Sequence, residues 1–257
     1  MFSNLNFKIY SSLLLSSVVL FSSACRPSTT AALPTMENAM SGVYSNSNEG
    51  EFIVKRRGLS YLEGESAFTN KFNITIVKKL PSVLLEVIRL NEGASLEDLK
   101  SDPAIEYVEP NYVRKMNFQP VAAKSPQASA ASVRISNITQ ANNLYKGRPF
   151  TTVAVVSTGV DLNHPDLKSK LVTGFSSFSE EDSPQDINGI GTHQAGVIVA
   201  SNPSAGVFGV APDCKVMPIK AMNEDGEIRD ADLILGVVWA VDHGASVVTL
   251  TAEVKSP

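Results

Sequence analysis

The strongest constraint on the fold is the alternation of short apolar runs with an amphipathic stretch in the second half of the chain. The apolar runs are typical of strands buried on both faces of a sheet. Residues 230–243 have apolar side chains at helical spacing and are followed by Gly244, a typical helix stop. Strands separated by helical stretches favour an α/β fold with a parallel sheet and flanking helices. The predicted strands are 152–156, 171–175, 215–221 and 246–250. The predicted apolar face of the helix consists of Leu233, Ile234, Val237, Val238 and Val241.

The preceding segment, residues 50–116, predicts a different architecture. Its expected order is strand, helix, strand, strand, helix, strand, which is the ferredoxin-like split βαβ pattern. Ser95 followed three residues later by Asp98 is typical of a helix N-cap. A small α+β domain is therefore predicted ahead of the parallel sheet. Its predicted elements are strand 51–57, helix 60–71, strands 74–79 and 82–90, a helix after Ser95 and strand 105–113.

The composition of the remaining segments sets the expected domain boundaries. Residues 1–24 combine Lys8 with an apolar run and small residues, as a secretory signal does. Residues 25–49 and 117–132 are rich in small and polar residues and Pro, which predicts a flexible tether and a linker. Residues 133–257 form the predicted α/β domain.

Cys25 is a candidate site of lipidation, because Ser22-Ser-Ala-Cys25 resembles a bacterial lipobox, in which the Cys becomes the lipidated N-terminus. This predicts an exported, membrane-anchored lipoprotein of a bacterial envelope, attached by an anchor and not by a span. The alternative is plain cleavage after Ala24, which gives a periplasmic or secreted protein. Cys214 is expected to be a buried apolar side chain.

Charge and cysteine usage exclude several other functions. The formal net charge is −4, so nucleic acid is not an expected partner. No Cys or His spacing indicates a metal site, and no cofactor motif occurs. Asp166 is expected to order its own turn and not to bind calcium.

Two motifs in residues 153–196 carry most of the functional information. The first is Val153-Ala-Val-Val-Ser-Thr-Gly159, and the second is Asn188-Gly-Ile-Gly-Thr-His-Gln-Ala-Gly196. They resemble the subtilisin-like serine proteases (subtilases), in which the first motif has Asp-Ser/Thr-Gly and the second His-Gly-Thr-His-x-Ala-Gly. In this alignment Ser157 occupies the Asp position and Ile190 the position of the catalytic His.

These two substitutions remove the chemistry that the resemblance implies. Serine peptidase catalysis needs an imidazole base, a carboxylate that orients it, and a nucleophilic hydroxyl. Ser157 offers no negative charge, and Ile190 can neither accept nor donate a proton. Another arrangement, Ser157 with Asp161 and His193, is disfavoured because His193 lies three residues after Ile190 and projects in a different direction.

The rest of the resemblance adds two further expected losses. The family's nucleophile motif, Gly-Thr-Ser, does not occur, so the resemblance implies a truncated catalytic domain that represents its N-terminal half. The family's substrate-lining strand has Ser-Leu-Gly-Gly where this chain has Thr251, Ala252, Glu253 and Val254. Glycines at those positions admit a substrate backbone, whereas Glu253 would crowd it.

Residues 105–113, which read Ile-Glu-Tyr-Val-Glu-Pro-Asn-Tyr-Val, resemble the end of the subtilase propeptide. The resemblance implies that residues 50–116 are an inhibitory propeptide domain. Three hypotheses follow: an inactive peptidase homologue that binds envelope proteins, a propeptide-type inhibitor or chaperone of an active subtilase in trans, and a fragment of a split or frameshifted endopeptidase.

Overall fold

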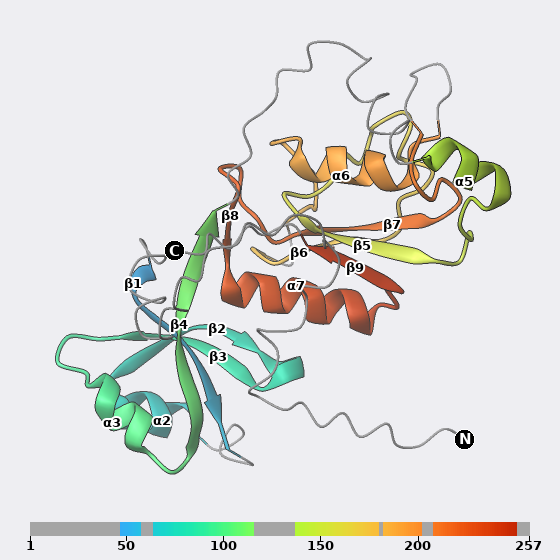
Figure 1. The fold of residues 1–257 in the computed structure, drawn as a ribbon. Coiled ribbons are helices and arrows are strands. Elements are labelled where there is room, and N and C mark those ends of the chain that lie inside the picture. The colour runs from blue at the N-terminus through green and yellow to red at the C-terminus, as the bar shows by residue number, and fades with distance from the viewer. Residues whose placement is uncertain (1–46, 58–63, 116–136, 180–181, 202–207, 251–257) are drawn as a thin grey trace, which may run out of the picture.

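The larger unit of the molecule is a parallel sheet between two helices (Figure 1). The computed structural model describes residues 47–57, 64–115, 137–179, 182–201 and 208–250. The sheet has the strand order β6-β7-β5-β9, and all its pairs are parallel. The α/β fold with a parallel sheet and flanking helices is therefore confirmed. The strands are β5 (Thr152–Ser157), β6 (Phe175–Ser176), β7 (Lys215–Lys220) and β9 (Val247–Leu250).

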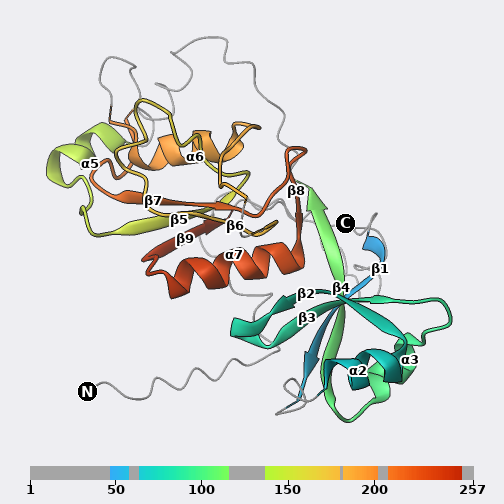
Figure 2. The same ribbon diagram turned by 180° about the vertical axis from the view of Figure 1, so that it is seen from behind.

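Helices α6 (Ile190–Val199) and α7 (Asp230–Asp242) cover opposite faces of this sheet, and α5 (Ile138–Leu144) precedes β5 (Figures 1 and 2). Strand residues alternate between the two faces. Val155 packs with Ala195 and Val199 of α6, whereas its neighbour Val156 packs in a cluster with Ala240 of α7. The two sides of the strand therefore build two separate cores.

Helix α7 has the predicted position, but its sheet-facing surface differs from the predicted one. Its buried residues include Gly236 and Ala240. A Cβ at Gly236 would lie 2.8 Å from Ile219 Cγ2, so small residues let the helix lie directly on the sheet. The prediction for Val241 is wrong, because 58% of this residue is exposed. Leu233 and Val237 pack at the margin of the core.

The strand predicted over residues 171–175 is mostly absent. Only β6 forms, and Leu171 makes an isolated bridge to Val216. Val216 donates its N–H to Lys170 O and accepts from Val172 N. The next residue of β7 on that side is Pro218, which has no N–H to extend the ladder.

The smaller unit is an antiparallel sheet with the order β2-β3-β1-β4. The predicted N-cap of α3 is confirmed, because Ser95 Oγ accepts from Asp98 N at 3.2 Å. The strand predicted from residue 82 begins only at Leu85, because Pro81–Val83 form a 3-10 turn and Leu84 has a φ of 56°. The elements in chain order are β1 (Ser47–Arg56), α2 (Glu65–Phe72), β2 (Ile74–Leu80), η2 (Pro81–Val83), β3 (Leu85–Leu90), α3 (Leu96–Ser101) and β4 (Ile105–Lys115).

The two faces of this smaller sheet have different neighbours. Val54 and Ile88 point into a core closed by Phe68 of α2 and Leu99 of α3. On the other face, Ile53, Leu80, Leu85 and Val87 cluster with Ala231 of α7. The smaller sheet therefore packs between its own helices and the larger unit.

Strand β4 also joins the two units by backbone pairing. It extends past its neighbours, and its last residues pair antiparallel with β8 (Glu227–Arg229), just before α7 (Figure 1). The register couples Val113 with Arg229 and Lys115 with Glu227. The sheet of the smaller unit thus continues into the larger unit as β2-β3-β1-β4-β8.

Candidate functional site

The substituted Asp position, Ser157, is the last residue of β5. It is completely buried, and its Oγ has no hydrogen-bond partner. Its carbonyl oxygen accepts from Ala221 N and Met222 N, both at 3.0 Å. The backbone of the site is therefore fixed firmly, while the side chain adds neither charge nor a hydrogen bond.

The substituted His position, Ile190, is the first residue of α6 and is 6% exposed. The next residue, Gly191, lies against the end of β5. A Cβ added to Gly191 would lie 3.2 Å from Ser157 Cβ and 1.9 Å from Gly159 O. The fold thus brings the start of α6 against Ser157, but the two substituted positions supply only a hydroxyl group and a hydrocarbon side chain.

A buried carboxylate, Asp186, organises the loop before α6. Its oxygens accept from Thr158 Oγ1 at 2.9 Å, Thr192 Oγ1 at 2.6 Å and the N–H groups of Gly189 and Thr192, both at 2.9 Å. Burial acts to raise the pKa of Asp186, but the hydrogen bonds from Thr192, Gly189 and Thr158 outweigh it, and the pKa is lowered. Asp186 is therefore ionised, and its carboxylate holds the first turn of α6 in place.

The alternative arrangement of Ser157, Asp161 and His193 does not assemble into a site. Asp161 Oδ1 accepts from Asn163 N at 3.0 Å and Gln185 Nε2 at 3.2 Å, and Ser157 Oγ has no partner. His193 is exposed on α6. No hydrogen bond joins these three side chains in the described part of the chain.

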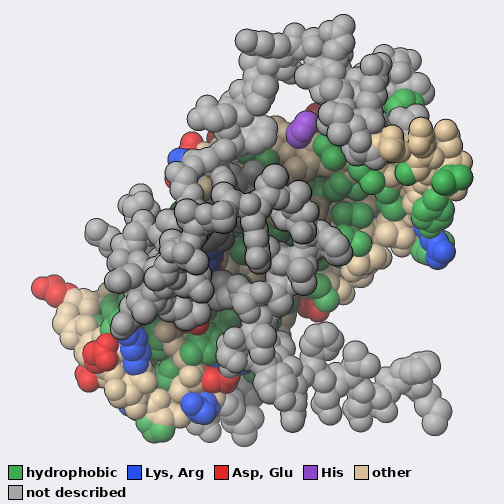
Figure 3. Space-filling view, viewed as in Figure 1, with side chains coloured by type: hydrophobic (Ala, Val, Ile, Leu, Met, Phe, Trp, Pro, Cys, Tyr) green, Lys and Arg blue, Asp and Glu red, His purple; other side chains and the backbone are tan. Residues whose placement is uncertain are grey.

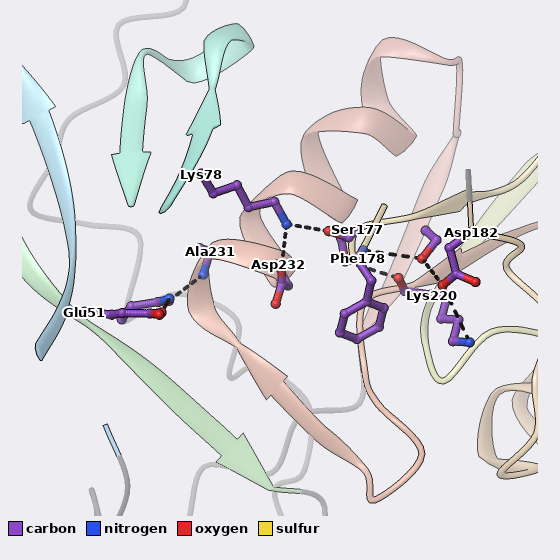
Figure 4. A network of polar contacts seen from close by, with 10 residues as sticks. Glu51, Lys78, Ser177, Phe178, Asp182, Lys220, Ala231 and Asp232 are labelled. Atoms are coloured by element: carbon purple, nitrogen blue, oxygen red, sulfur yellow. Dashed lines mark hydrogen bonds and ion pairs between the residues drawn. The ribbon is translucent and has the colours of Figure 1, made fainter. Parts of the chain in front are cut away.

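A second group of polar residues lies where the two units meet. Lys78 of β2 points to the first turn of α7, where its Nζ donates to Asp232 Oδ1 at 2.6 Å (Figure 4). The same Nζ donates to Ser177 O, which follows β6. The side chain of Asp232 is 6% exposed and that of Lys78 is 27% exposed. One amine therefore links the smaller unit to two elements of the larger one.

Two further contacts fasten the same helix end. Arg114 of β4 forms a two-pronged ion pair with Asp230, with Nη2 to Oδ2 at 2.9 Å. Asn111 Oδ1 accepts from Ala231 N at 3.1 Å and so satisfies one of the free N–H groups of the helix. Asn111 is itself oriented by Glu51, which accepts from its Nδ2 at 3.2 Å. Together these contacts define the docking contact, which consists of Lys78, Asn111 and Arg114 with Asp230 and Asp232.

Several predicted site residues lie outside the described part of the chain. These are Cys25 and the substrate-strand positions Thr251, Ala252 and Glu253. Asp166 Oδ1 accepts from Ser201 N at 3.2 Å, so it joins two loops in addition to any role within its own turn. The described residues contain no cluster of three or more His, Cys, Asp or Glu that could hold a metal ion. They also include no helix of the length and apolarity that a membrane span requires.

The sequence predicts that Ser157 and Ile190 occupy substituted positions, but it did not predict the docking contact. The acidic first turn of α7 was visible in the sequence, as Asp230 and Asp232. Its partners Lys78 and Arg114 lie more than 100 residues away, and no sequence pattern linked them.

Comparison with known proteins places these features in context. Residues 150–252 match the model of the subtilase family. The chain is 28% identical over 207 residues to a thermophilic serine proteinase of Bacillus sp. and 32% identical over 178 residues to subtilisin E of Bacillus subtilis. These matches cover 80% and 68% of this chain but 48% and 44% of the relatives, so the chain spans about half the length of the curated relatives it matches.

Solved structures give the same result. Fervidolysin from Fervidobacterium pennivorans, a keratinolytic enzyme related to subtilisin, aligns with a TM-score of 0.59 and 27% identity over 81% of this chain and 36% of that one. The epidermin leader peptide processing serine protease of Staphylococcus aureus aligns with a TM-score of 0.58 at 18% identity, covering 78% of this chain and 49% of that one, which shows a shared fold.

Proposed function

Because this chain belongs to the subtilase family, we propose that it is a catalytically inactive member, a pseudoprotease that acts by binding other proteins. The observation that carries this proposal is Ile190 at the start of α6, where the family places its catalytic base. A buried hydrocarbon side chain cannot take the proton of a nucleophilic hydroxyl group. In subtilisin, loss of the catalytic His alone costs about 10⁶-fold in turnover.

The environment of Ser157 supports the same proposal. A catalytic carboxylate at this position would be buried, and it would need a hydrogen-bond donor such as an imidazole N–H. Here the neighbouring helix begins with Ile190 and Gly191. A buried neutral hydroxyl group with no hydrogen bond costs far less in this environment than a buried carboxylate without a partner would.

The first test is labelling with a fluorophosphonate, a reagent that reacts with activated serine hydroxyl groups, together with hydrolysis of a chromogenic peptide. The purified chain is expected to show neither reaction, and subtilisin E serves as the positive control. The matched variant Ser157→Ala is expected to behave identically. Labelling that is lost in Ser157→Ala would mean that Ser157 is an active nucleophile and would refute the proposal.

We further propose that the smaller unit is a propeptide-like domain that stays docked. Three observations support this. The 207 residues that align with the thermophilic serine proteinase exceed the length of residues 150–252, so the alignment includes residues outside that range. Strand β4 pairs with β8, and Asn111 caps α7. A chain without the catalytic groups has no means of releasing this domain by cleaving itself.

A second candidate function is inhibition or folding assistance of an active subtilase in trans, as the docking contact would allow. In the isolated chain this surface is already occupied by α7. The substitutions Asp230→Ala and Asp232→Ala should release the surface intact and increase inhibition of subtilisin E. The substitutions Lys78→Ala and Arg114→Ala should release it but damage it, and so should not increase inhibition. Equal effects of the two pairs would contradict a role in trans.

We propose that the protein is exported and anchored to the bacterial envelope through Cys25. The predicted signal at residues 1–24 supports this location. Metabolic labelling with a radioactive fatty acid should mark the natural chain and leave Cys25→Ala unmarked. Equal labelling of both chains would exclude Cys25 as the acylated residue.

A further inference from the structure

The end of α5 and the segment that leads to β5 expose three large apolar side chains. Leu144 is 90% exposed, Phe150 is 75% exposed and Tyr145 is 58% exposed. Figure 3 shows hydrophobic side chains gathered at the α5 end of the molecule, with basic side chains beside them. Exposed apolar clusters of this kind mark interaction sites, since their burial in a partner is favourable.

The backbone that carries these side chains is held in place. Asp213 N donates to Lys146 O and Thr151 N donates to Arg148 O, both at 2.9 Å. Between them, Gly147 has a φ of 91°, and a Cβ there would lie 2.5 Å from Cys214 Sγ. The exposed side chains therefore extend from a fixed platform packed against the core.

The charges around this platform are mostly positive. Lys146 and Arg148 are the only charged residues between positions 138 and 152. Arg148 Nε donates to Tyr145 Oη at 2.7 Å, and its guanidinium lies 5.6 Å from the centre of the Phe150 ring. Lys215, at the start of the neighbouring strand β7, donates its N–H to Thr151 O.

Further basic residues lie at the same end of the sheet, where β5 and β7 begin. Lys215 Nζ donates to Ser169 O, which lies between Lys168 and Lys170. Five basic residues therefore lie at this end of the sheet, against the acidic residues Asp166, Asp213 and Asp242. Although the whole chain has a net charge of −4, charges more than about 8 Å away are largely screened at physiological salt, so the local balance decides the contact.

We infer that residues 144–150, the basic-aromatic platform, form a membrane-contact surface that binds anionic phospholipid. Aromatic and aliphatic side chains enter the boundary between headgroups and acyl chains, while Lys and Arg attract anionic headgroups. Lipid fits better than nucleic acid, because a protruding aliphatic side chain such as Leu144 gains nothing from a phosphate backbone. This contact is independent of Cys25 and would hold the folded domain flat against a bilayer.

The first experiment measures cosedimentation of the full chain carrying Cys25→Ser with phosphatidylglycerol vesicles and with phosphatidylcholine vesicles. Combining Leu144→Ser with Phe150→Ser should weaken binding to the anionic vesicles roughly tenfold or more, because two large apolar side chains no longer become buried. Combining Lys146→Glu with Arg148→Glu should abolish the preference for anionic vesicles at low salt. The matched control, Val77→Ser with Leu84→Ser, removes exposed apolar side chains of the smaller unit and should have no effect.

A second experiment determines which surface of the folded protein contacts the lipid, even if the N-terminal segment also binds the vesicles. A fluorophore is attached in the Cys25→Ser background at Asn143→Cys or at Glu97→Cys, both exposed positions, while the remaining Cys214 is buried. Position 97 lies on α3, at the far end of the molecule from α5 (Figures 1 and 2). Nitroxide-labelled lipid should quench position 143 strongly and position 97 weakly. Equal quenching, or unchanged vesicle binding in both platform variants, would overturn the inference and would assign the apolar residues to a protein partner.

Discussion

Replacing Lys78 by Met should weaken the docking of the smaller unit on α7. Met keeps most of the unbranched side chain, is one atom shorter, and removes the charge. The Asp232 carboxylate would then be left with 6% of its side chain exposed and without its ionic partner. Exposed ion pairs contribute about 0.2–1 kcal/mol, whereas breaking a fully buried pair costs about 3–5 kcal/mol. Because Lys78 is 27% exposed, we expect an intermediate loss of about 2 kcal/mol, roughly a thirtyfold change in the docking equilibrium.

The neighbouring lysine provides a matched control. Lys79 lies on the same strand but pairs with Glu65, and both of those side chains are substantially exposed, at 41% and 56%. Lys79→Met should therefore cost less than about 0.5 kcal/mol. A double-mutant cycle of Lys78→Met with Asp232→Asn should give a coupling energy between about 1 and 3 kcal/mol.

The assay is urea unfolding followed by two signals. Trp239, the only tryptophan, lies on α7, where its ring stacks on Phe175 at 5.0 Å, so its fluorescence reports the larger unit. Far-ultraviolet circular dichroism reports both units. The natural chain should give coincident transitions, and Lys78→Met should give a circular dichroism change that precedes the Trp239 change. Equal behaviour of Lys78→Met and Lys79→Met, or a coupling energy near zero, would refute the role assigned to Lys78.

Substitutions at three further positions test other parts of the structure. Asp186→Asn should lower the free energy of unfolding by about 2–3 kcal/mol at neutral pH, since charge-assisted hydrogen bonds from Thr158, Gly189 and Thr192 are weakened. The folded pKa of Asp186 lies below its ordinary value of 3.8, so this stabilisation is present above that value and is lost as pH falls through the lower folded pKa. Urea titrations from neutral to acidic pH should therefore show the natural chain and the variant converging, and a constant difference would contradict the assignment. Ser157→Ala should be neutral or stabilising by up to about 1 kcal/mol, because it removes a buried hydroxyl group without a partner. Ser157→Asp should destabilise the fold by several kcal/mol, because it buries a charge without a partner. Thermal unfolding in which Ser157→Asp is the more stable variant would contradict this. Gly147→Ala should cost more than 1 kcal/mol, because it combines a φ of 91° with a contact 2.5 Å from Cys214 Sγ, and an unchanged melting temperature would contradict this.

Much of the fold follows from local sequence patterns. The apolar runs gave β5 and β7 almost to the residue, and Gly244 correctly marked the end of α7, with a φ of 83°. The Ser95 cap formed as its spacing predicts, because the contact lies within four residues. Such features depend on neighbours in the chain, so the sequence alone suffices to predict them.

The errors arise where distant contacts decide the outcome. The strand predicted at residues 171–175 depends on donors from β7, and Pro218 supplies none. The predicted apolar face of α7 grouped large apolar side chains at helical spacing. The helix can lie close to the sheet, however, because Gly236 has no Cβ. The charges of Asp230 and Asp232 gave no sign of their partners in β2 and β4.

The candidate catalytic site shows the same division. The motifs predict that Ser157 and Ile190 occupy the Asp and His positions, because the neighbouring residues match the family pattern on both sides. The importance of Asp186 was not predicted, since five donors converge on its carboxylate only after β5, the loop and α6 have assembled.

The loss of catalysis that we attribute to Ile190 can be tested by measuring the intact mass of the purified full chain after prolonged incubation at neutral pH. A pseudoprotease with a docked propeptide-like domain predicts one undivided polypeptide, with no fragment that ends between residues 116 and 132. Such a fragment, formed at a rate independent of chain concentration and blocked by a serine-directed inhibitor, would show self-cleavage and contradict the proposed loss of catalysis.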